Sequence, residues 1–290
     1  MDELDADADY ELVDNVDVEA GLAYWKTQPA NLDGVLGGFG SGSLPRIESL
    51  GSRLFLLNLL PELSAVSSAL RPLNAAPSRR TRALDVGAGI GRVTADVLLH
   101  LVSDVVLLEP ADHFIQEAVA RGHASTTGSS APSQAGQPRP WKGIADQSKS
   151  VTFLRQTLQD FDPTRPHHAE MIDRVGYVPR ETDAVSGFDI VWCQWCLGHL
   201  NDPDLVAFLR RSRAALREKD RSLIVVKENL CSDGPDGSEC VIFDEQDSSL
   251  TRSDKAWKIA FQEAGLNLVH EQVQQGLPDG LYVVKMYALQ

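Results

Sequence analysis

The sequence ALDVGAGIGRVTADVLL, residues 83–99, joins a short apolar run to three closely spaced glycines and then to a helical pattern. Asp85 stands near the end of the apolar run, and Gly87, Gly89 and Gly91 follow it. Glycines directly after a strand let the backbone approach a ligand at the carboxyl end of a parallel sheet. The stretch therefore predicts a strand, a nucleotide-binding turn and a helix.

The chain around this stretch alternates short apolar runs with amphipathic segments. Strands are predicted at 82–87, 104–109, 151–155, 188–193, 222–229, 267–274 and 281–289, and helices at 91–101, 111–121, 203–218 and 251–264. Such alternation is typical of a mostly parallel sheet covered on both faces. The short QGLPDG linker before the last strand predicts an antiparallel hairpin at the sheet edge. The predicted class is α/β, with a Rossmann-like, mostly parallel sheet of seven strands.

Composition predicts three parts in the chain. Residues 1–19 hold nine Asp or Glu and no Lys or Arg, which predicts an acidic, disordered tail. Residues 20–80 predict a helical extension with an amphipathic helix near 46–60. Its glycine-rich segment LDGVLGGFG predicts a hairpin-like gate. Residues 81–290 then form the main domain.

Two polar segments interrupt the main domain. Residues 123–150 are rich in Ser, Gly, Gln and Pro, and residues 162–187 contain several helix and strand breakers. Both segments predict long surface loops.

Charge and cysteine usage exclude several classes of protein. The formal net charge is −14, which argues against a general nucleic-acid binder. No apolar run approaches the roughly 20 residues of a membrane span, and no signal-peptide core stands at the N-terminus. We therefore expect an intracellular protein without a membrane partner.

The four cysteines predict reduced thiols rather than a disulfide framework. Cys193 and Cys196 form a C-x-x-C pair, which is compatible with metal or redox use. Cys231 and Cys240 are too widely spaced for the usual zinc knuckle. No metal site is expected.

The glycine turn alone fits either a dinucleotide or S-adenosylmethionine. Glu109, at the end of the next strand, is placed to bind ribose hydroxyls in both cases. Asp85 is unfavourable beside a pyrophosphate, and Arg92 is suited to pair with a carboxylate. These two residues favour S-adenosylmethionine. The alternatives are a surface arginine and a strand-end Asp that holds the turn through backbone N–H groups.

Longer motifs resemble a known family. YWKTQPANLDGVLGGFG, ALDVGAGIGR, VVLLEPADHF, FDIVWCQWCLGHL, VVKENL, VIFDEQDSSLTRS and LPDGLYVV occur in the order found in the protein alpha-N-terminal methyltransferases. The resemblance covers about residues 20–290 apart from the two polar segments. It implies a class I S-adenosylmethionine-dependent methyltransferase fold. The implied reaction methylates the free α-amino group of proteins that begin X-Pro-Lys or X-Pro-Arg after Met removal, once or several times, and yields S-adenosylhomocysteine.

The resemblance also implies site residues. The cofactor site would contain Trp25, Gly87, Arg92, Glu109, Leu158, Gln159 and Gln194. The peptide channel would contain Leu36, Gly37, Trp195, His199, Asn229, Asp244, Asp247, Ser249 and Tyr282. Glu109 stands where an Asp is usual in the family, and its longer side chain should still reach the ribose.

Asp247 and His199 are the predicted catalytic pair. Near neutral pH a free α-amine is largely protonated, so methyl transfer needs a group that accepts a proton. Histidine has a matched pKa, and a carboxylate orients the ammonium. Alternatively, His199 caps the helix near Pro203 and Asp247 caps the helix after Ser249.

Other chemical roles follow for the channel. Trp195 offers an aromatic wall to the proline ring and tolerates the methylated amine through a cation–π contact. Its alternative is a core tryptophan, because IVWCQW has a buried-strand pattern. Asp244 suits the basic third residue of the substrate.

Competing functions remain open at this point. They are a class I methyltransferase of small-molecule amines, an NAD-dependent oxidoreductase and a non-catalytic binding module. We expect a monomer in the cytoplasm, with the nucleus also open, and family resemblance implies ribosomal proteins among the substrates.

Overall fold

The computed structural model describes residues 16–64, 66, 79–127, 139–178 and 186–290. Within these ranges the main sheet has eight strands in the order β4-β3-β2-β1-β5-β6-β10-β9, and a separate hairpin pairs β7 with β8. The strands are β1 (Arg82–Val86), β2 (Asp104–Leu108), β3 (Ser150–Arg155), β4 (Glu170–Gly176), β5 (Ile190–Gln194), β6 (Leu223–Leu230), β7 (Val241–Asp244), β8 (Ser249–Arg252), β9 (Leu268–Val273) and β10 (Val283–Leu289).

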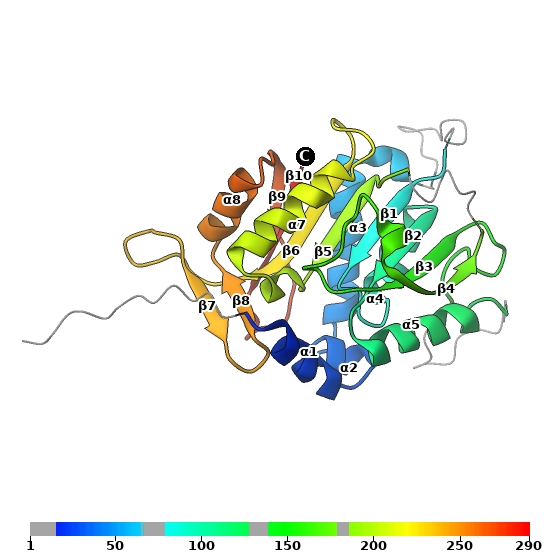
Figure 1. The fold of residues 1–290 in the computed structure, drawn as a ribbon, viewed down its shortest axis with the longest axis horizontal. Coiled ribbons are helices and arrows are strands. Elements are labelled where there is room, and N and C mark those ends of the chain that lie inside the picture. Colours follow the sequence, from blue (N-terminus) through cyan, green and yellow to red (C-terminus); the bar gives the residue numbers. More distant parts are fainter. Residues whose placement is uncertain (1–15, 65, 67–78, 128–138, 179–185) are drawn as a thin grey trace, which may run out of the picture.

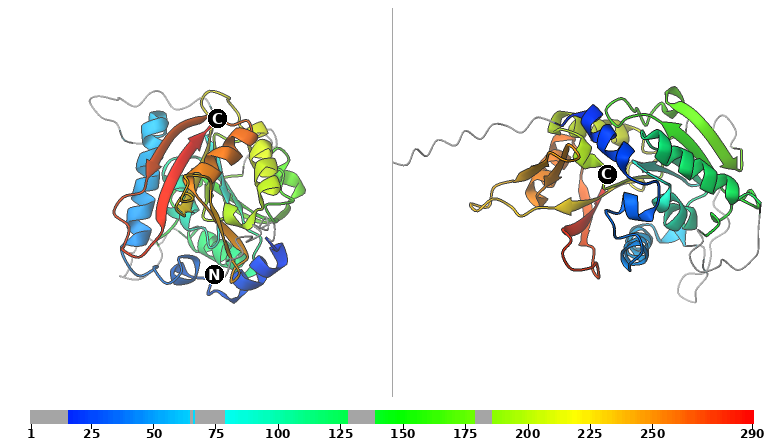
Figure 2. Two further views of the ribbon diagram at one scale, coloured as in Figure 1. Left: turned by 90° about the vertical axis from the view of Figure 1, so that its left-hand side faces the viewer. Right: turned by 90° about the horizontal axis from the view of Figure 1, so that it is seen from below.

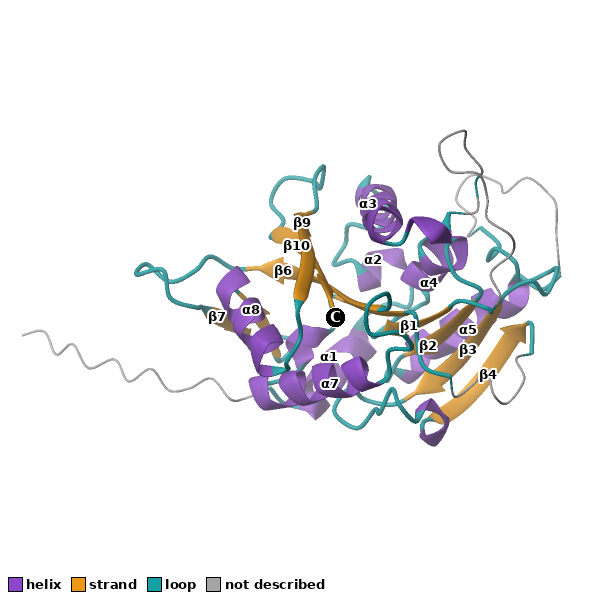
Figure 3. Ribbon diagram, turned by 90° about the horizontal axis from the view of Figure 1, so that it is seen from above, coloured by secondary structure: helices purple, strands orange, loops and turns teal. Residues whose placement is uncertain are grey.

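Figure 3 shows helices on both sides of the sheet. They are α1 (Val18–Thr27), α2 (Leu32–Val35), α3 (Leu44–Leu59), α4 (Arg92–Asp96), α5 (Asp112–Ala124), α7 (Asp202–Ala214) and α8 (Asp254–Glu263), with short 3-10 turns η1 (Pro61–Leu63), η2 (Leu98–His100), η3 (Pro166–His168) and η4 (Leu197–His199). Helices α7 and α8 cover one face, and α3, α4 and α5 cover the other (Figure 1).

Side chains of the central strands point alternately to the two faces of the sheet, so both faces need a layer of helices. Leu84 and Val86 of β1 join the core under α7 and α8, whereas Ala83 joins the core under α3 and α4. Successive side chains of a strand point to opposite faces, so an all-apolar strand requires cover on both sides. The predicted α/β class is confirmed, including the antiparallel β9–β10 hairpin at one edge.

Two predicted boundaries and the predicted number of strands were wrong. Residues 170–176 form β4, an antiparallel edge strand on β3, inside the segment predicted as a loop at 162–187. Only Val175 of this strand is buried, so the strand lacks the apolar pattern of the central strands. The described sheet thus has eight strands rather than seven. The predicted helix at 251–264 begins only at Asp254, because residues 249–252 belong to β8.

The predicted loop at 123–150 also contributes to the core. Trp141 is 3 % exposed and packs on Phe153 of β3 with a ring-centroid distance of 6.0 Å. Residues 128–138 of this segment lie outside the described residues.

The N-terminal extension wraps the carboxyl ends of the central strands. Asp17 caps α1 by accepting from the amides of Glu19 and Ala20, so the described part of the predicted tail forms the start of a helix. Residues 1–15 lie outside the described residues. The predicted gate hairpin is instead the short helix α2 followed by a turn. Helix α3 confirms the amphipathic pattern near 46–60.

The β7–β8 hairpin stands apart from the main sheet. Figures 1 and 2 show it projecting at the side of the molecule where α1 begins. A hydrogen bond of 2.8 Å from the Asp17 amide to Ser248 Oγ joins the start of α1 to the turn of this hairpin. The carboxyl ends of the strands, α1 and the hairpin therefore enclose one region.

No described helix is both long and apolar enough to cross a lipid bilayer.

Candidate active site

The glycine turn after β1 lies against the turn after β5. Gly87 has a φ of +60°, and a Cβ added there would lie 2.5 Å from the Cβ of Cys196. Only glycine combines this left-handed backbone with so close an approach. Asp85 is buried and accepts a 2.6 Å hydrogen bond from the Thr94 hydroxyl, which ties β1 to α4 across the turn. The alternative role expected of Asp85 was to hold the turn through backbone N–H groups, whereas this bond comes from a hydroxyl of α4.

Glu109 fastens the same turn from β2. Its carboxylate oxygens accept from the amides of Gly89 and Ala111, both at 2.8 Å. Burial raises the pKa of this carboxyl to about 7, although both hydrogen bonds act to lower it. Each carboxylate oxygen has a second lone pair, so the group retains acceptors for a diol at its exposed side.

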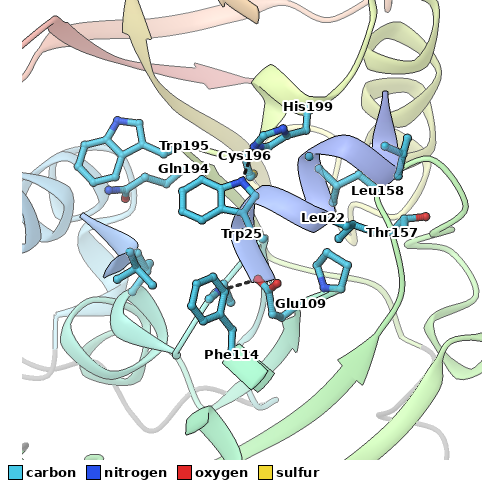
Figure 4. A pocket seen from close by; sticks show the side chains of 18 of the residues that line it. Leu22, Trp25, Glu109, Phe114, Thr157, Leu158, Gln194, Trp195, Cys196 and His199 are labelled. Carbon is cyan, nitrogen blue, oxygen red and sulfur yellow. Dashed lines mark hydrogen bonds between the residues drawn. The ribbon is translucent and has the colours of Figure 1, made fainter. Parts of the chain in front are cut away.

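A pocket opens above these groups, between the strand ends and α1 (Figure 4). All seven residues predicted for the cofactor site line it: Trp25, Gly87, Arg92, Glu109, Leu158, Gln159 and Gln194. Trp195 and His199 of the predicted peptide channel line it as well. Sequence reasoning missed the apolar wall of Leu22, Val35 and Phe114, and also Thr157, which lines the pocket with them.

The pocket suits the chemistry of S-adenosylmethionine. The left-handed Gly87 leaves room that a Cβ would fill, Glu109 offers acceptors for hydroxyls, and Arg92 offers a cation for a carboxylate. Trp25 covers the pocket with its ring 6.2 Å from that of Phe114, which supplies aromatic surface for a purine.

Arg92 also has a partner that sequence reasoning did not foresee. Its Nη1 forms a buried ion pair with Glu48 of α3. Glu48 further accepts from Gln194 Nε2 at 2.9 Å and from Lys227 Nζ at 3.0 Å. The surface-arginine alternative for Arg92 is wrong, because its exposure is 6 %.

The segment after β5 turns sharply into the pocket. Trp195 has a φ of +54°, which is uncommon for a bulky residue and marks local strain at a functional site. Glu228 of β6 holds the turn by accepting from the amides of Cys196 and Leu197, each at 3.0 Å. The Trp195 indole Nε1 is buried without a hydrogen-bond partner among the described residues. Trp195 is thus a pocket residue rather than a core tryptophan.

His199 ends this segment in contact with α1. Its Nε2 accepts from the indole Nε1 of Trp25 at 2.8 Å, so the neutral ring carries its proton on Nδ1. Burial lowers the pKa of His199, against the opposing effects of Asp247 and of a hydrogen bond with the Ser248 backbone. The imidazole is therefore neutral near pH 7, the form that accepts a proton.

Asp247 lies in the β7–β8 turn beside His199. Its Oδ1 is buried and has no hydrogen-bond partner within the described part of the chain. The capping alternatives were wrong for both residues, because Asn201 caps α7 and Ser253 caps α8. A buried, unpaired carboxylate oxygen is costly unless a donor arrives, so this atom marks a place for a cationic ligand.

The other predicted channel residues fall into two groups. Asp244 and Ser249 face each other in the β7–β8 register, next to the turn that holds Asp247. Tyr24 of α1 belongs to this group, because burial and then the charges of Asp247 and Asp244 raise the pKa of its phenol. Sequence reasoning missed it, although it stands in the YWK motif.

The second group lies away from that carboxylate pair. Leu36 is buried after α2, Gly37 is left-handed at +57°, Asn229 pairs with Val284, and Tyr282 is half exposed. No hydrogen bond of the described residues joins these side chains to Asp247 or His199. Their place in a substrate channel stays a prediction.

The C-x-x-C pair has the properties of structural thiols. Cys193 and Cys196 are free and buried, and burial raises both pKa values well above the ordinary value. Protonated, buried thiols are poor metal ligands and nucleophiles.

Comparisons with known proteins agree with this geometry. Residues 14–290 match the family model described as AdoMet dependent proline di-methyltransferase. An Arabidopsis thaliana relative named Alpha N-terminal protein methyltransferase 1 is 34 % identical over 269 residues, covering 93 % of this chain and 78 % of the relative. A human relative named N-terminal Xaa-Pro-Lys N-methyltransferase 1 is 32 % identical over 269 residues, covering 92 % of each chain.

A solved structure shows the same fold. It is a SAM-dependent methyltransferase of Leishmania major with 30 % identity and a TM-score of 0.64, covering 94 % of this chain and 82 % of that one. The pocket built on the glycine turn, the family model and these relatives together identify the chain as an S-adenosylmethionine-dependent methyltransferase that belongs to the AdoMet-dependent proline di-methyltransferase family.

Proposed function

We propose that this protein methylates the α-amino group of proteins that begin X-Pro-Lys or X-Pro-Arg, with Asp247 and His199 as its catalytic pair. The single observation that carries the proposal is the buried, unpaired Oδ1 of Asp247 beside a neutral, pocket-lining histidine. A carboxylate so placed is suited to an ammonium group, and the names of the relatives point to the same chemistry.

The cofactor and the protein make different contributions to the reaction. S-adenosylmethionine supplies a methyl group on a sulfonium, and the new N–C bond forms as the C–S bond breaks. The protein must bind the amine, align it and remove its proton, because an ammonium group has no lone pair to attack with. Alignment inside a pocket closed by Trp25 also limits access of water.

His199 is the proposed proton acceptor. Its Nε2 lone pair is engaged by the Trp25 indole at 2.8 Å, so this bond must break before Nε2 receives a proton from the amine. Asp247 orients the ammonium and stabilises the imidazolium that forms, because its negative charge acts to raise the pKa of His199. The proton then passes to solvent.

Specificity is proposed to arise around this pair. Trp195 supplies an aromatic face to the proline ring, and Asp244 a carboxylate to the basic third residue. Leu36, Gly37, Asn229, Ser249 and Tyr282 complete the proposed channel. Ribosomal proteins as substrates, a monomeric state and residence in the cytoplasm, or also the nucleus, belong to the same proposal and rest on family resemblance.

Mass spectrometry of a peptide that begins Ser-Pro-Lys tests the proposal directly. The peptide is incubated with the protein and S-adenosylmethionine, beside a copy acetylated at its N-terminus and a copy in which Ala replaces Pro. We expect mass gains in steps of one methyl group on the free Pro peptide only. Methylation of the acetylated copy would refute α-amine transfer. No gain on any peptide, with turnover of small amines, would support the small-molecule alternative.

A further inference from the structure

A buried charge cluster lies directly behind the cofactor pocket. At its centre is Glu48 of α3, whose side chain is fully buried. Its Oε1 accepts from Ser52, Gln194 and Lys227 at 2.9 to 3.0 Å, and its Oε2 pairs with Arg92. Arg92 and Gln194 line the pocket, whereas Glu48 and Lys227 do not. Glu48 therefore contacts two pocket residues from outside the pocket.

The remaining contacts leave Glu48 little freedom. Lys227 also donates to Ser52 Oγ at 2.9 Å and to Gln274 Oε1 at 3.2 Å, which fixes its ammonium group beside Glu48. The other end of the Gln194 amide accepts from the Trp192 indole at 3.1 Å. These contacts hold Glu48, Lys227 and Gln194 in place from outside the pocket.

The charges of this cluster do not balance. Burial opposes ionisation of Glu48, but Arg92 and Lys227 hold its pKa down at about 2, and burial lowers the pKa of Lys227 to about 8. One carboxylate thus faces two cations at neutral pH. Asp85 is a second carboxyl near Arg92, but burial raises its pKa to about 7, so it is only partly ionised at neutral pH and offsets only part of the excess positive charge. An anion in the pocket beside Arg92 would compensate the excess positive charge.

We propose that Glu48 is a positioning residue, which aims Arg92 and Gln194 at the carboxylate of the amino-acid portion of S-adenosylmethionine. Arg92 has five N–H donors in a rigid plane, and Glu48 holds it through Nη1. The opposite edge can then present paired donors to a second carboxylate. Helix α3 of the N-terminal extension thereby becomes part of cofactor recognition. This inference rests on the proposed assignment of Arg92 to the cofactor.

Binding of two ligands that differ in the amino-acid portion tests whether Glu48 positions Arg92 and Gln194 or only stabilises the fold. S-adenosylhomocysteine carries the carboxylate, and 5′-methylthioadenosine lacks the whole amino-acid portion. Titration calorimetry of Glu48→Gln should show a loss of at least about tenfold in affinity for the first ligand. Affinity for the second should stay within about twofold of the wild type. Equal losses for both ligands, or no loss for either, would overturn the proposal.

Arg92→Gln distinguishes failure of the inference from failure of the site assignment. If Arg92→Gln selectively weakens S-adenosylhomocysteine and Glu48→Gln does not, the positioning role of Glu48 is refuted while the assignment stands. If Arg92→Gln weakens neither ligand, the assignment of Arg92 to the cofactor fails, and the inference fails with it.

A second variant covers the case in which Glu48→Gln does not fold. Glu48→Gln with Lys227→Met removes one charge of each sign, so the cluster keeps the net charge of the wild type. We expect it to recover thermal stability but not selective binding of S-adenosylhomocysteine. Wild-type selectivity in this double variant would contradict the proposal. Glu62→Gln serves as the matched control, because Glu62 forms an exposed pair with Arg221 after α3 and should change neither affinity.

Discussion

Glu228, which holds the turn after β5, should make the free energy of unfolding depend on pH. Its Oε1 accepts from the Cys196 and Leu197 amides, and burial raises its pKa from 4.5 to about 7 against those two hydrogen bonds. Between these two pH values the folded protein keeps a proton that the unfolded chain has released. The free energy of unfolding therefore falls as pH rises through this interval.

Glu228→Gln removes this pH dependence while it keeps the acceptor oxygen. At about 1.36 kcal/mol per pH unit, an interval of about 2.5 units amounts to about 3.4 kcal/mol, of which about 2.5 kcal/mol develops between pH 5 and pH 8. The variant should therefore gain stability relative to the wild type as pH rises. Asp85 and Glu109, whose pKa values are also raised to about 7, cancel in the comparison.

Urea unfolding of both proteins at pH 5, 6, 7 and 8 measures this difference. The reasoning is refuted if the stability of Glu228→Gln relative to the wild type stays constant over that range. Glu62→Gln, an exposed carboxyl change, should show no such trend. Because Gln retains the hydrogen bonds that shape the Trp195 turn, methyl transfer should stay close to the wild-type rate.

Three further predictions concern the reaction and the pocket. Gly87→Ala should abolish S-adenosylhomocysteine binding in calorimetry, because its Cβ would lie 2.5 Å from Cys196 in a left-handed backbone; near-normal affinity would contradict the close approach. Asp247→Asn and His199→Gln should each lower kcat by about 100-fold with cofactor affinity nearly unchanged, and loss of cofactor binding instead would assign them a structural role. Trp25→Phe removes the donor to Nε2, so NMR titration should show a higher pKa for His199, by about 0.7 unit for a bond of about 1 kcal/mol; an unchanged pKa would show that the bond does not form in solution.

Short stretches of sequence were enough to predict the local features of this protein. A strand, a left-handed glycine turn and a helix follow from ALDVGAGIGR, because backbone sterics and apolar alternation act over a few residues. The same reasoning located Glu109 at the next strand end and the β9–β10 hairpin. Family motifs supplied the pocket residues, all seven of which converge in space.

Contacts between distant groups could not be predicted from any one segment, because they depend on how the chain folds. Glu48 and Lys227 are 179 positions apart, and neither stands out in its own segment. Both are buried in the folded protein, where each charged group needs the other as its partner. Strand β4 was missed because an exposed edge strand needs no apolar pattern. Trp25 and His199, which are 174 positions apart in the chain, share a hydrogen bond that no local pattern encodes. Local sterics act along the chain, whereas desolvation and charge pairing depend on which segments the folded core brings together.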